Sequence, residues 1–325
     1  MRLSVLFVTA MYPHPEKPGN GAFVMHQAEQ LRAMGHHVDV IHVKGYKSRW
    51  NYLRGALAVI RATWLGRYDV VHVHYGLTGL CALVRWRTPM VVTLHGSDVL
   101  QGRLQALVSR FVSAIAAATV VVSPEIARRC HGSLIPCGVD LEKFRPVDRE
   151  YARQRVGLSA SCTYVLFPFD PGRQLKRHDL AEAAVALLRR QGMDVSLLAV
   201  WNASNDQMPL YYAAADAMVL CSDTEGSPTS VKEALACNLP VVSTDVGDVR
   251  AIMRGVEGTE ICDQNAPSIA MALARVLERS EVAAFDGRSA MGGYEQRATT
   301  EALVAVYRRV IRRTPRIPVR VSGSG

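Results

Sequence analysis

Two carboxylates stand eight residues apart in the segment Glu225-Gly-Ser-Pro-Thr-Ser-Val-Lys-Glu233. An apolar run over residues 217–222 precedes this segment and a helix-forming run follows it, so the segment lies on a strand-to-helix turn. We predict that Ser227 is the helix N-cap and that Pro228 is the first helical residue. The free N–H groups and positive dipole of such a helix end favour an anion such as a pyrophosphate.

The positions of these two carboxylates indicate what they can bind. Glu225 lies before the helix and Glu233 lies on it, about two turns in. The pair can therefore contact two separate pairs of vicinal hydroxyls on one elongated ligand, and a sugar nucleotide is such a ligand. The alternative is that Glu225 only favours the helix dipole while Glu233 is a solvated helix residue. The spacing alone leaves both interpretations open.

A second candidate group is basic. Arg173 and Lys176 lie in a turn that leaves a buried strand and enters a helix, where their cations can reach a diphosphate. An arginine offers a fork of donors and a lysine a point charge, so the two can neutralise a leaving group without a metal. The neighbouring Arg177 leaves the assignment ambiguous by one position, and basic residues in an exposed turn are also common. The chain has no Asp-x-Asp pair, which agrees with cation-assisted rather than Mg²⁺-assisted departure.

A small glycine loop, Gly19-Asn20-Gly21, precedes a helical pattern. Such a loop lets the backbone approach a phosphate closely, and a plain turn is the alternative.

Three histidines end predicted strands. His95 can donate a hydrogen bond to a sugar hydroxyl, or it can be a structural histidine bonded in the region of Asp98. His72 and His74 end another strand and, with His95, could imitate a metal site. No carboxylate stands at the spacing of a metal ligand set, so we predict no metal site.

The elements that must position these residues alternate between strand-like and helix-like runs, which predicts doubly wound parallel sheets. In the first half we expect strands at 3–8, 37–43, 69–74, 90–95 and 119–123, and helices at 21–34, 52–65, 77–85 and 104–117. In the second half we expect strands at 163–168, 195–200, 217–222, 240–243 and 260–262, and helices at 178–191, 209–215, 228–236, 266–278 and 294–312.

A chain of 325 residues suits two domains of about 150 residues each. We predict an N-terminal Rossmann-like domain over 1–155 and a C-terminal Rossmann-like domain over 156–312, whose last helix can pack back on the first. Residues 313–325 form a basic tail that we expect to be flexible. Two such domains place the carboxyl ends of both sheets around a central cleft, and each motif above follows a strand end.

Composition narrows the class of protein. Apolar residues make up 49% and charged residues 21%, as in ordinary globular domains. The seven cysteines are scattered without a Cys-x-x-Cys pair, which favours a reduced, cytosolic chain. The N-terminus shows no charged-then-apolar leader, and no apolar stretch approaches the roughly 20 residues of a membrane span.

The net charge of +9 is unevenly distributed. Residues 1–155 contain 20 Lys and Arg against 10 Asp and Glu, whereas residues 156–325 contain 18 against 19. Within the first half, residues 47–67 mix cations, aromatics and aliphatics at helical spacing. Such a helix can lie on an anionic membrane surface, and a solvated helix with one core-facing stripe is the alternative. We find no nucleic-acid recognition motif and expect no nucleic-acid partner.

Over nearly its whole length the chain resembles glycosyltransferase family 4, the retaining, nucleotide-sugar-dependent enzymes of GT-B fold. The resemblance rests on the Gly19–Gly21 loop, Gly35-His-His-Val38, Asp69-Val-Val-His-Val-His74, Thr93-Leu-His-Gly-Ser-Asp98, Val122-Ser123, Ile135-Pro-Cys-Gly-Val-Asp140 with Phe144 and Pro146, Arg173 with Lys176, the Glu225–Glu233 segment, and Ala236-Cys-Asn-Leu-Pro-Val-Val-Ser243 with Gly247. The second half is most similar to members that build cell-envelope polymers such as teichuronic acid or exopolysaccharide.

The resemblance implies roles for the matched positions. Glu225 would hold donor-sugar hydroxyls, Glu233 the ribose hydroxyls, and His95 the sugar near its 6-position. The catalytic group would be Arg173, Lys176, His95 and Glu225; the donor-binding group would be Gly21, Gly226, Ser227, Pro228, Thr229 and Glu233; an acceptor or secondary group would be Asn20, His74 and Asp98.

The chain also departs from the family pattern. It is shorter than most members, and Cys137-Gly138 replaces the commoner Asn-Gly. Trp201-Asn-Ala-Ser204 stands where a glycine-containing turn often contacts the base, so the resemblance leaves the base open between a UDP-sugar and a GDP-sugar.

These observations predict a retaining, metal-independent hexosyltransferase that uses no cofactor besides the nucleoside-diphosphate sugar. Its acceptor would be a glycan or a lipid-linked acceptor of cell-envelope or exopolysaccharide synthesis. We expect it in the cytoplasm, or peripherally on the inner face of the plasma membrane. A sugar-nucleotide epimerase of the same fold and a non-catalytic sugar-nucleotide-binding paralogue are the alternatives.

Overall fold

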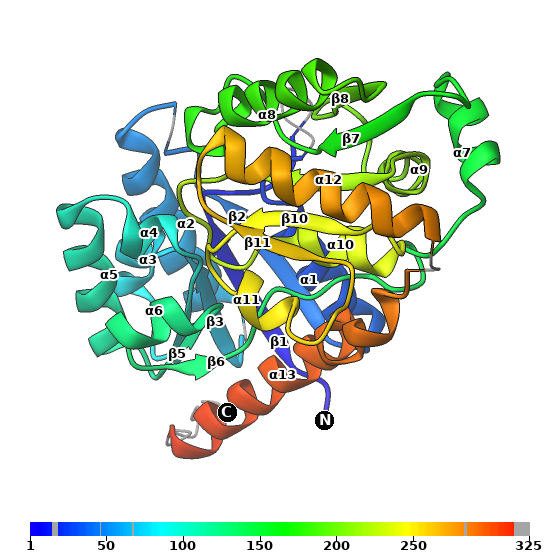
Figure 1. Cartoon of the computed structure of the whole chain (residues 1–325). Helices are drawn as coiled ribbons and strands as arrows, with labels where there is room; N and C mark the ends of the chain where they lie inside the picture. The colour runs from blue at the N-terminus through cyan, green and yellow to red at the C-terminus, as the bar shows by residue number, and fades with distance from the viewer. Residues whose placement is uncertain (15–18, 46, 67, 283–284, 315–325) are drawn as a thin grey trace, which may run out of the picture.

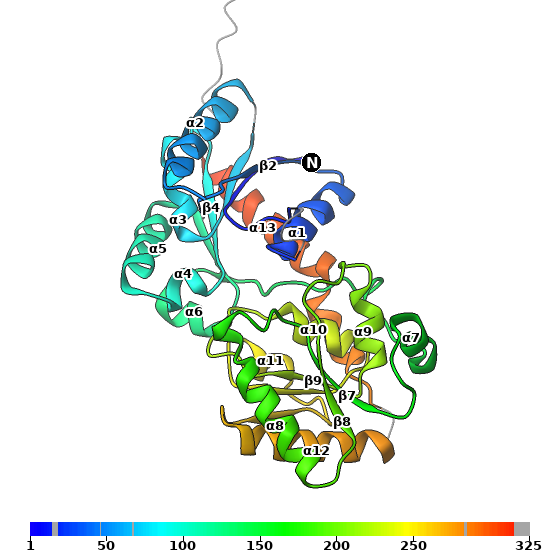
Figure 2. The same cartoon turned by 90° about the horizontal axis from the view of Figure 1, so that it is seen from above.

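The computed structural model describes residues 1–14, 19–45, 47–66, 68–282 and 285–314. It consists of two parallel sheets, each with helices on both faces (Figures 1 and 2). None of the helices in these ranges combines the length and the apolar character needed to cross a membrane.

The first sheet is six-stranded and parallel, in the order β2-β1-β3-β4-β5-β6. Its strands β3 and β4 are buried at every position, as expected for valine-rich strands covered on both faces. The strands are β1 Ser4–Thr9, β2 His37–His42, β3 Val70–His74, β4 Met90–Leu94, β5 Ala118–Val121 and β6 Ser133–Leu134.

Helices cover both faces of this sheet. One face packs against the helical side that contains Val59, Cys81 and Val112, and the other packs against α1 and the last helix of the chain. The helical elements of this half are α1 Ala22–Ala33, α2 Trp50–Leu65, α3 Gly76–Gly79, the 3-10 helix η1 Leu80–Val84, α4 Ser97–Leu100, α5 Arg103–Ile115 and α6 Pro124–Arg129.

The continuous helix that we predicted over 77–85 is wrong. The structure has the short α3 followed by the 3-10 turn η1. The cause is close packing under α5: a Cβ atom at Gly76 would clash with Ser109, and one at Gly79 would clash with Val112. The close contact with α5 therefore requires glycine at both positions.

The second sheet is five-stranded and parallel, in the order β11-β10-β9-β7-β8. Its strands are β7 Thr163–Phe167, β8 Val195–Ala199, β9 Ala217–Leu220, β10 Val241–Thr244 and β11 Glu260–Cys262. Figure 2 shows α8 and α12 on one side of this sheet and α9 and α10 on the other. The helical elements are α7 Arg149–Val156, η2 Gln174–Lys176, α8 His178–Arg190, α9 Met208–Ala214, α10 Thr229–Ala236, α11 Val249–Ile252, α12 Ala266–Val282 and η3 Arg288–Tyr294.

The last helix, α13 Gln296–Arg313, returns to the first sheet. Its residues Leu303, Tyr307 and Val310 pack in one cluster with β1 and α1. Figure 1 shows α13 crossing beneath β1.

The domain limits stay a prediction, and one contact bears on the boundary after residue 155. Helix α7 spans that boundary and packs against α9 of the second unit. Arg153 on α7 also donates to the carbonyl of Ala214 at 3.0 Å and forms an ion pair with Asp216 at 2.7 Å. We therefore describe α7 with the second unit. The predicted tail lies mostly in residues 315–325, outside the described residues.

Candidate active site

The two units meet where β4 and β9 end. Gly96 follows β4, and a Cβ atom at this glycine would lie 2.9 Å from the Cα atom of Gly226, which follows β9. A Cβ atom at Gly226 would in turn clash with the carbonyl oxygen of His95. Gly96 also has a φ of 111°, which favours glycine. Both glycines are therefore needed for the carboxyl ends of the two sheets to touch, the place where parallel sheets bind ligands.

Lys176 and Glu225 form an ion pair at this meeting point. Their side chains are only 10% and 15% exposed. The Lys176 ammonium lies 3.9 Å from the ring centroid of Phe169, and the Ser222 hydroxyl donates to Glu225 at 2.7 Å. Burial lowers the pKa of Lys176, and the charge of Glu225 opposes that shift. The pair thus holds a positive and a negative group in fixed positions beside the cleft.

Arg173 precedes η2 and is exposed. Its charge lowers the pKa of Lys176 and opposes the raised pKa that burial gives Tyr75 of the first unit. Among the described residues, no ion pair occupies its guanidinium. Arg173 and Lys176 are brought together, whereas Arg177 pairs with Asp179 at 2.8 Å on the exposed side of the turn.

Glu233 lies on α10 and is held rather than freely solvated. Its carboxylate accepts a hydrogen bond of 2.8 Å from the Tyr212 hydroxyl, which comes from the buried side of α9. Burial raises the pKa of Glu233, while hydrogen bonds from Tyr212 and Thr229 lower it. The structure therefore places Glu225 before the helix and an oriented Glu233 along it, as the spacing predicts.

The predicted N-cap is wrong. Helix α10 begins at Thr229, and Pro228 occupies the N-cap position in an extended conformation, with no side-chain cap. The Ser227 hydroxyl faces another network: it donates to Asp248 at 2.7 Å and accepts from the Cys137 N–H at 3.1 Å. It therefore links the segment between the two units to the motif.

The reason is a buried charge, Lys232, which is fully inaccessible to solvent. Its ammonium donates to Ser227 and lies 3.3 Å from Asp248. A buried charge must be paired and hydrogen-bonded, so the demands of Lys232 decide where Ser227 points. Burial raises the pKa of Asp248, and Lys232 opposes the shift. Among the described residues, the second oxygen of Asp248 has no hydrogen-bond partner.

The three histidines gather in the first unit. Nδ1 of His74 and Nε2 of His95 are 3.0 Å apart. His72 lies deeper, with hydrogen bonds to Thr93 at 2.7 Å and to Tyr307 of α13 at 2.6 Å. Burial lowers the pKa of His72 and His95 to about 3 each and that of His74 well below its usual range. All three rings are therefore neutral near pH 7. In the His74–His95 contact, one ring donates its N–H and the other ring accepts it.

Asp98 positions this group. Its carboxylate accepts the N–H groups of His95 at 3.1 Å, Gly96 at 3.0 Å and Gly76 at 3.1 Å. Burial raises its pKa to about 6, and these backbone hydrogen bonds oppose the shift. We infer that Asp98 fixes the turn that carries His95, in agreement with the structural alternative considered for this pair.

The glycine loop lies beside His95. Gly21 has a φ of 71°, and a Cβ atom there would clash with the backbone of Met11. Two residues later, the Phe23 ring lies 4.8 Å from the ring of His95. Asn20 is half-buried at the start of α1. Residues 15–18 of the predicted loop region lie outside the described residues.

Tyr75 is a cleft residue that the sequence did not reveal. It follows β3 with a φ of 73° and a ψ of 137°, which is uncommon for a bulky residue and concentrates at functional sites. Its ring lies 4.8 Å from the ring of His95. The only signal in the sequence is an aromatic residue directly after a strand end.

Among the described residues no three His, Cys, Asp or Glu side chains form a set of metal ligands.

Two family models match the chain, one in each half. The model of Glycosyltransferase Family 4 covers residues 42–143, and that of Glycosyl transferases group 1 covers residues 179–279. The D-inositol 3-phosphate glycosyltransferase of Geodermatophilus obscurus is 29% identical, over 74% of this chain and 66% of its own length. TuaC of Bacillus subtilis, assigned to teichuronic acid biosynthesis as a glycosyltransferase, is 26% identical, over 84% of this chain and 89% of its own.

Solved structures agree on the fold. Sucrose-phosphate synthase from Thermosynechococcus elongatus superposes with a TM-score of 0.79 at 20% identity, over 95% of this chain and 99% of that one. Anabaena HepE, solved in complex with UDP-glucose, gives a TM-score of 0.71 at 15% identity, over 95% and 100%. The predicted α/β fold of two facing units is thus confirmed, and fold and matched models define a glycosyltransferase of the GT-B class. The first unit is thus similar to Glycosyltransferase Family 4, and the second is similar to Glycosyl transferases group 1.

The buried pair of Lys232 and Asp248 generates a stability prediction. Replacing Lys232 with Met leaves Asp248 buried and unpaired, so we expect Lys232→Met to lower the free energy of unfolding by about 3–5 kcal/mol. Adding Asp248→Asn removes the unpaired charge and should recover part of the loss. Urea unfolding, followed by circular dichroism, measures both changes.

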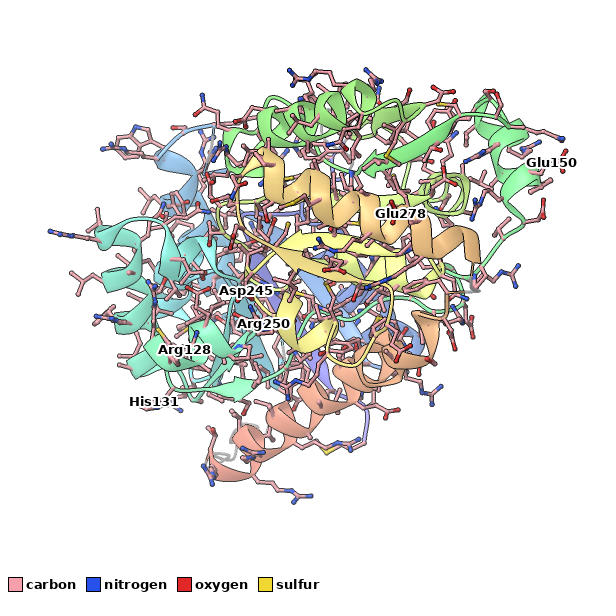
Figure 3. All side chains as sticks on the ribbon, in the orientation of Figure 1. Arg128, His131, Glu150, Asp245, Arg250 and Glu278 are labelled. Atoms are coloured by element: carbon pink, nitrogen blue, oxygen red, sulfur yellow. The ribbon has the colours of Figure 1, made fainter. Side chains whose placement is uncertain are left out.

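The control for this experiment is Arg250→Met, which breaks the exposed Arg250–Asp245 ion pair of 2.7 Å (Figure 3). Exposed pairs contribute about 1 kcal/mol or less. A loss for Lys232→Met no larger than that of the control would show that the buried network is not a stabilising constraint on the motif.

The histidine group generates a pH prediction. Because its pKa values lie near 3, the native state binds fewer protons than the unfolded state between pH 3 and about 6.5. The resulting contribution of the histidines to the free energy of unfolding is complete above pH 6.5 and is lost as the pH falls. Each unit by which a pKa is shifted corresponds to roughly 1.4 kcal/mol. Asp98, with its pKa near 6, acts in the opposite direction between about pH 4 and 6. Glu233 and Asp248, whose pKa values burial raises, act in the same direction as Asp98. Burial also lowers the pKa values of His26, His36 and His42, which adds to the effect of the histidine group.

We therefore expect the free energy of unfolding to fall between pH 7 and pH 5, and to fall less steeply in His72→Phe than in the wild type. Urea unfolding at a series of pH values gives the slopes. His131→Phe, which removes an exposed histidine (Figure 3), is the matched control. An unchanged slope in His72→Phe would contradict the assigned role of the buried histidines.

Proposed function

We propose that the protein is a retaining glycosyltransferase that moves a hexosyl group from a nucleoside-diphosphate sugar to an acceptor hydroxyl. The observation that carries this proposal is the Lys176–Glu225 ion pair at the carboxyl end of the second sheet, where the adjacent Gly226 contacts the backbone of His95 in the first unit. The pair presents a cation for a diphosphate and a carboxylate for sugar hydroxyls at one place. The structure of HepE in complex with UDP-glucose supports a nucleotide sugar as donor.

The proposed binding mode follows from the charges. Arg173 and Lys176 hold the diphosphate, and Glu225, released in part from Lys176 by the arriving anion, accepts hydrogen bonds from the donor sugar. Glu233 accepts from the ribose hydroxyls. The backbone from Gly226 to Thr229 lies against sugar and phosphate.

In the transfer, the bond between the anomeric carbon and the diphosphate oxygen breaks while the acceptor oxygen bonds to the same face of that carbon. The acceptor proton passes to the departing diphosphate. Arg173 and Lys176 stabilise the negative charge that develops on the leaving group. Charged groups that are already in position do this effectively, because they need not reorganise during the reaction. Because two cations supply this stabilisation, we propose that the reaction needs neither a metal nor a further cofactor.

His95 is the proposed contact to the sugar from the first unit. Its neutral ring can donate one N–H, and Asp98 fixes the turn on which it lies. The first unit would hold the acceptor, which we propose to be a glycan or lipid-linked acceptor of cell-envelope or exopolysaccharide synthesis. This acceptor would place the enzyme in the cytoplasm, peripherally on the inner face of the plasma membrane.

The epimerase alternative requires acid and base groups at the reacting carbon. His72, His74 and Asp98 are the residues that could supply these groups, and each of them is bonded within the first unit. His74 lies 3.0 Å from the ring nitrogen of His95. His72 bonds to Thr93 and Tyr307, and Asp98 accepts three backbone N–H groups. Transfer is therefore favoured over epimerisation.

The donor assignment predicts a thermal shift with nucleotides. UDP, GDP, UDP-glucose and GDP-mannose are tested separately with the full chain, and we expect one base to raise the melting temperature. A ligand at 100 times its dissociation constant adds about 2.7 kcal/mol of stability. Inorganic phosphate at the same concentration is the control. If neither diphosphate nor its sugar shifts the melt, the proposed donor site is wrong.

The leaving-group assignment predicts unequal effects of neighbouring cations. Lys176→Ala removes a fixed positive charge from the developing diphosphate, so we expect kcat for donor turnover to fall about 10²–10³-fold. Arg177→Ala removes the adjacent exposed cation, which pairs with Asp179 and Asp223, and should leave kcat within about threefold. Release of the nucleoside diphosphate measures both rates, and circular dichroism checks the fold. An equal or larger loss in Arg177→Ala would refute the assignment.

A further inference from the structure

Helix α5 presents an apolar stripe to solvent. Leu104, Leu107 and Phe111 are 74%, 64% and 51% exposed, and their spacing of three and four residues places them on one side of the helix. The opposite side is buried through Ser109 and Val112. A stripe of this kind normally faces a core. Here another side of the helix already packs against the core, so the exposed stripe is a second apolar side of the same helix.

Helix α2 repeats this arrangement. Trp50, Leu53, Leu57 and Trp64 are exposed, while Val59 is buried against the sheet. The ring of Trp64 lies 4.6 Å from that of Trp86, which follows η1 and is also exposed. Amphipathic rings of this type are enriched where proteins meet the polar boundary of a bilayer.

The two stripes belong to one continuous side of the first unit. Helix α2 packs against η1, η1 packs against α3, and α3 packs against α5. All of them cover the same face of the first sheet, and Figures 1 and 2 both show α2, α3 and α5 along one side of that unit. We call the exposed side chains of α2, η1 and α5, with Trp86, the outer helical face.

The segment that forms this face is mostly basic. Residues 40–124 contain ten Lys and Arg but only two acidic residues, Asp69 and Asp98. Asp98 is buried on backbone N–H groups, and Asp69 accepts the N–H of Ser4 at 2.9 Å. Arg87 lies over the Trp86 ring, 5.4 Å from its centroid. By contrast, the acidic side chains labelled in Figure 3, Glu150, Asp245 and Glu278, come from the second unit.

We propose that the outer helical face docks on a lipid bilayer that carries anionic headgroups. Exposed leucine, phenylalanine and tryptophan side chains in a segment rich in cations match the boundary between acyl chains and anionic phosphates. The inference deepens the proposed function, since it rests on a lipid-linked acceptor being delivered to the cleft from that surface. The fold provides the route: α3 follows Tyr75 and α4 follows His95, so the face adjoins the cleft side of the first sheet.

The experiment measures cosedimentation of the full chain with sucrose-loaded vesicles. The vesicles contain either phosphatidylcholine alone or phosphatidylcholine with phosphatidylglycerol. We expect the wild type to sediment with the anionic vesicles and to be released by salt. The variant Leu107→Glu/Phe111→Glu places two carboxylates on the exposed stripe of α5 without touching its buried side, and should reduce the bound fraction about tenfold or more.

The matched control is Met271→Glu, on α12 of the second unit, where Met271 is 58% exposed. It should sediment as the wild type does. Docking on anionic lipid is overturned if the double variant keeps wild-type binding, if Met271→Glu loses as much, or if neutral vesicles bind equally well. It is also overturned if the wild type forms a dimer by sedimentation velocity that the double variant does not, because a second copy would then cover the face.

A thermal shift with UDP and GDP, measured on the same variants, separates this proposal from the donor site. The outer helical face is remote from Lys176 in sequence and lies on the other unit, so the shift should be the same in the double variant and the wild type. Loss of vesicle binding with an unchanged nucleotide shift supports docking by this face. Absence of any nucleotide shift in the wild type would refute the donor site and leave the vesicle result as an independent measurement.

Discussion

The site depends on the contact between two backbones that carry no side chains, Gly96 and Gly226. Any Cβ atom at either position would meet the opposite loop, so the two strand ends come together only because both residues are glycines. A third glycine extends the arrangement: Gly247 follows β10 with a φ of 61°, and a Cβ atom there would lie 2.6 Å from the Gly226 carbonyl oxygen. Three strand ends converge at one point, and His95 and Glu225 flank it. Small displacements of either sheet would therefore change the distance between the two halves of the proposed site.

Two lysine–carboxylate pairs serve this arrangement in different ways. Lys232 and Asp248 are 0% and 4% exposed, so no ligand can replace either partner, and the pair fixes the loop before α10 through Ser227. Lys176 and Glu225 are 10% and 15% exposed beside the cleft, and an arriving anion can compete for the ammonium. Coulomb interactions strengthen as water is excluded, so the first pair acts as a permanent constraint and the second remains available for exchange with substrate.

The sequence predicted the sheets well because their strands are buried on both faces. Residues 69–74 and 90–95 are mainly apolar runs, and the structure places β3 and β4 within a residue of them. The start of α10 was predicted wrongly because Lys232 reads as a surface residue, whereas its burial redirects Ser227. The conformation of Tyr75 was not predictable, since a positive φ in a bulky residue has no local signature. Short elements such as α4 and α6 have too few residues to show a period.

The first unit depends on the last helix of the chain, α13, for part of its core. One face of the first sheet is covered by α1 together with α13, and the Tyr307 hydroxyl bonds to His72 inside that cluster. His72 lies beside His74, with ring centroids 4.3 Å apart, and His74 contacts His95. The packing of α13 is thus continuous with the histidines that reach the cleft. Since α13 leaves the second unit at Tyr294, where Val139 pairs with the backbone of residues 294–296, the segments that join the units also complete the core behind His95. A rotation of one unit on the other would have to be absorbed at these two crossings, between Cys137 and Val139 and before Gln296, because the chain passes from one sheet to the other there.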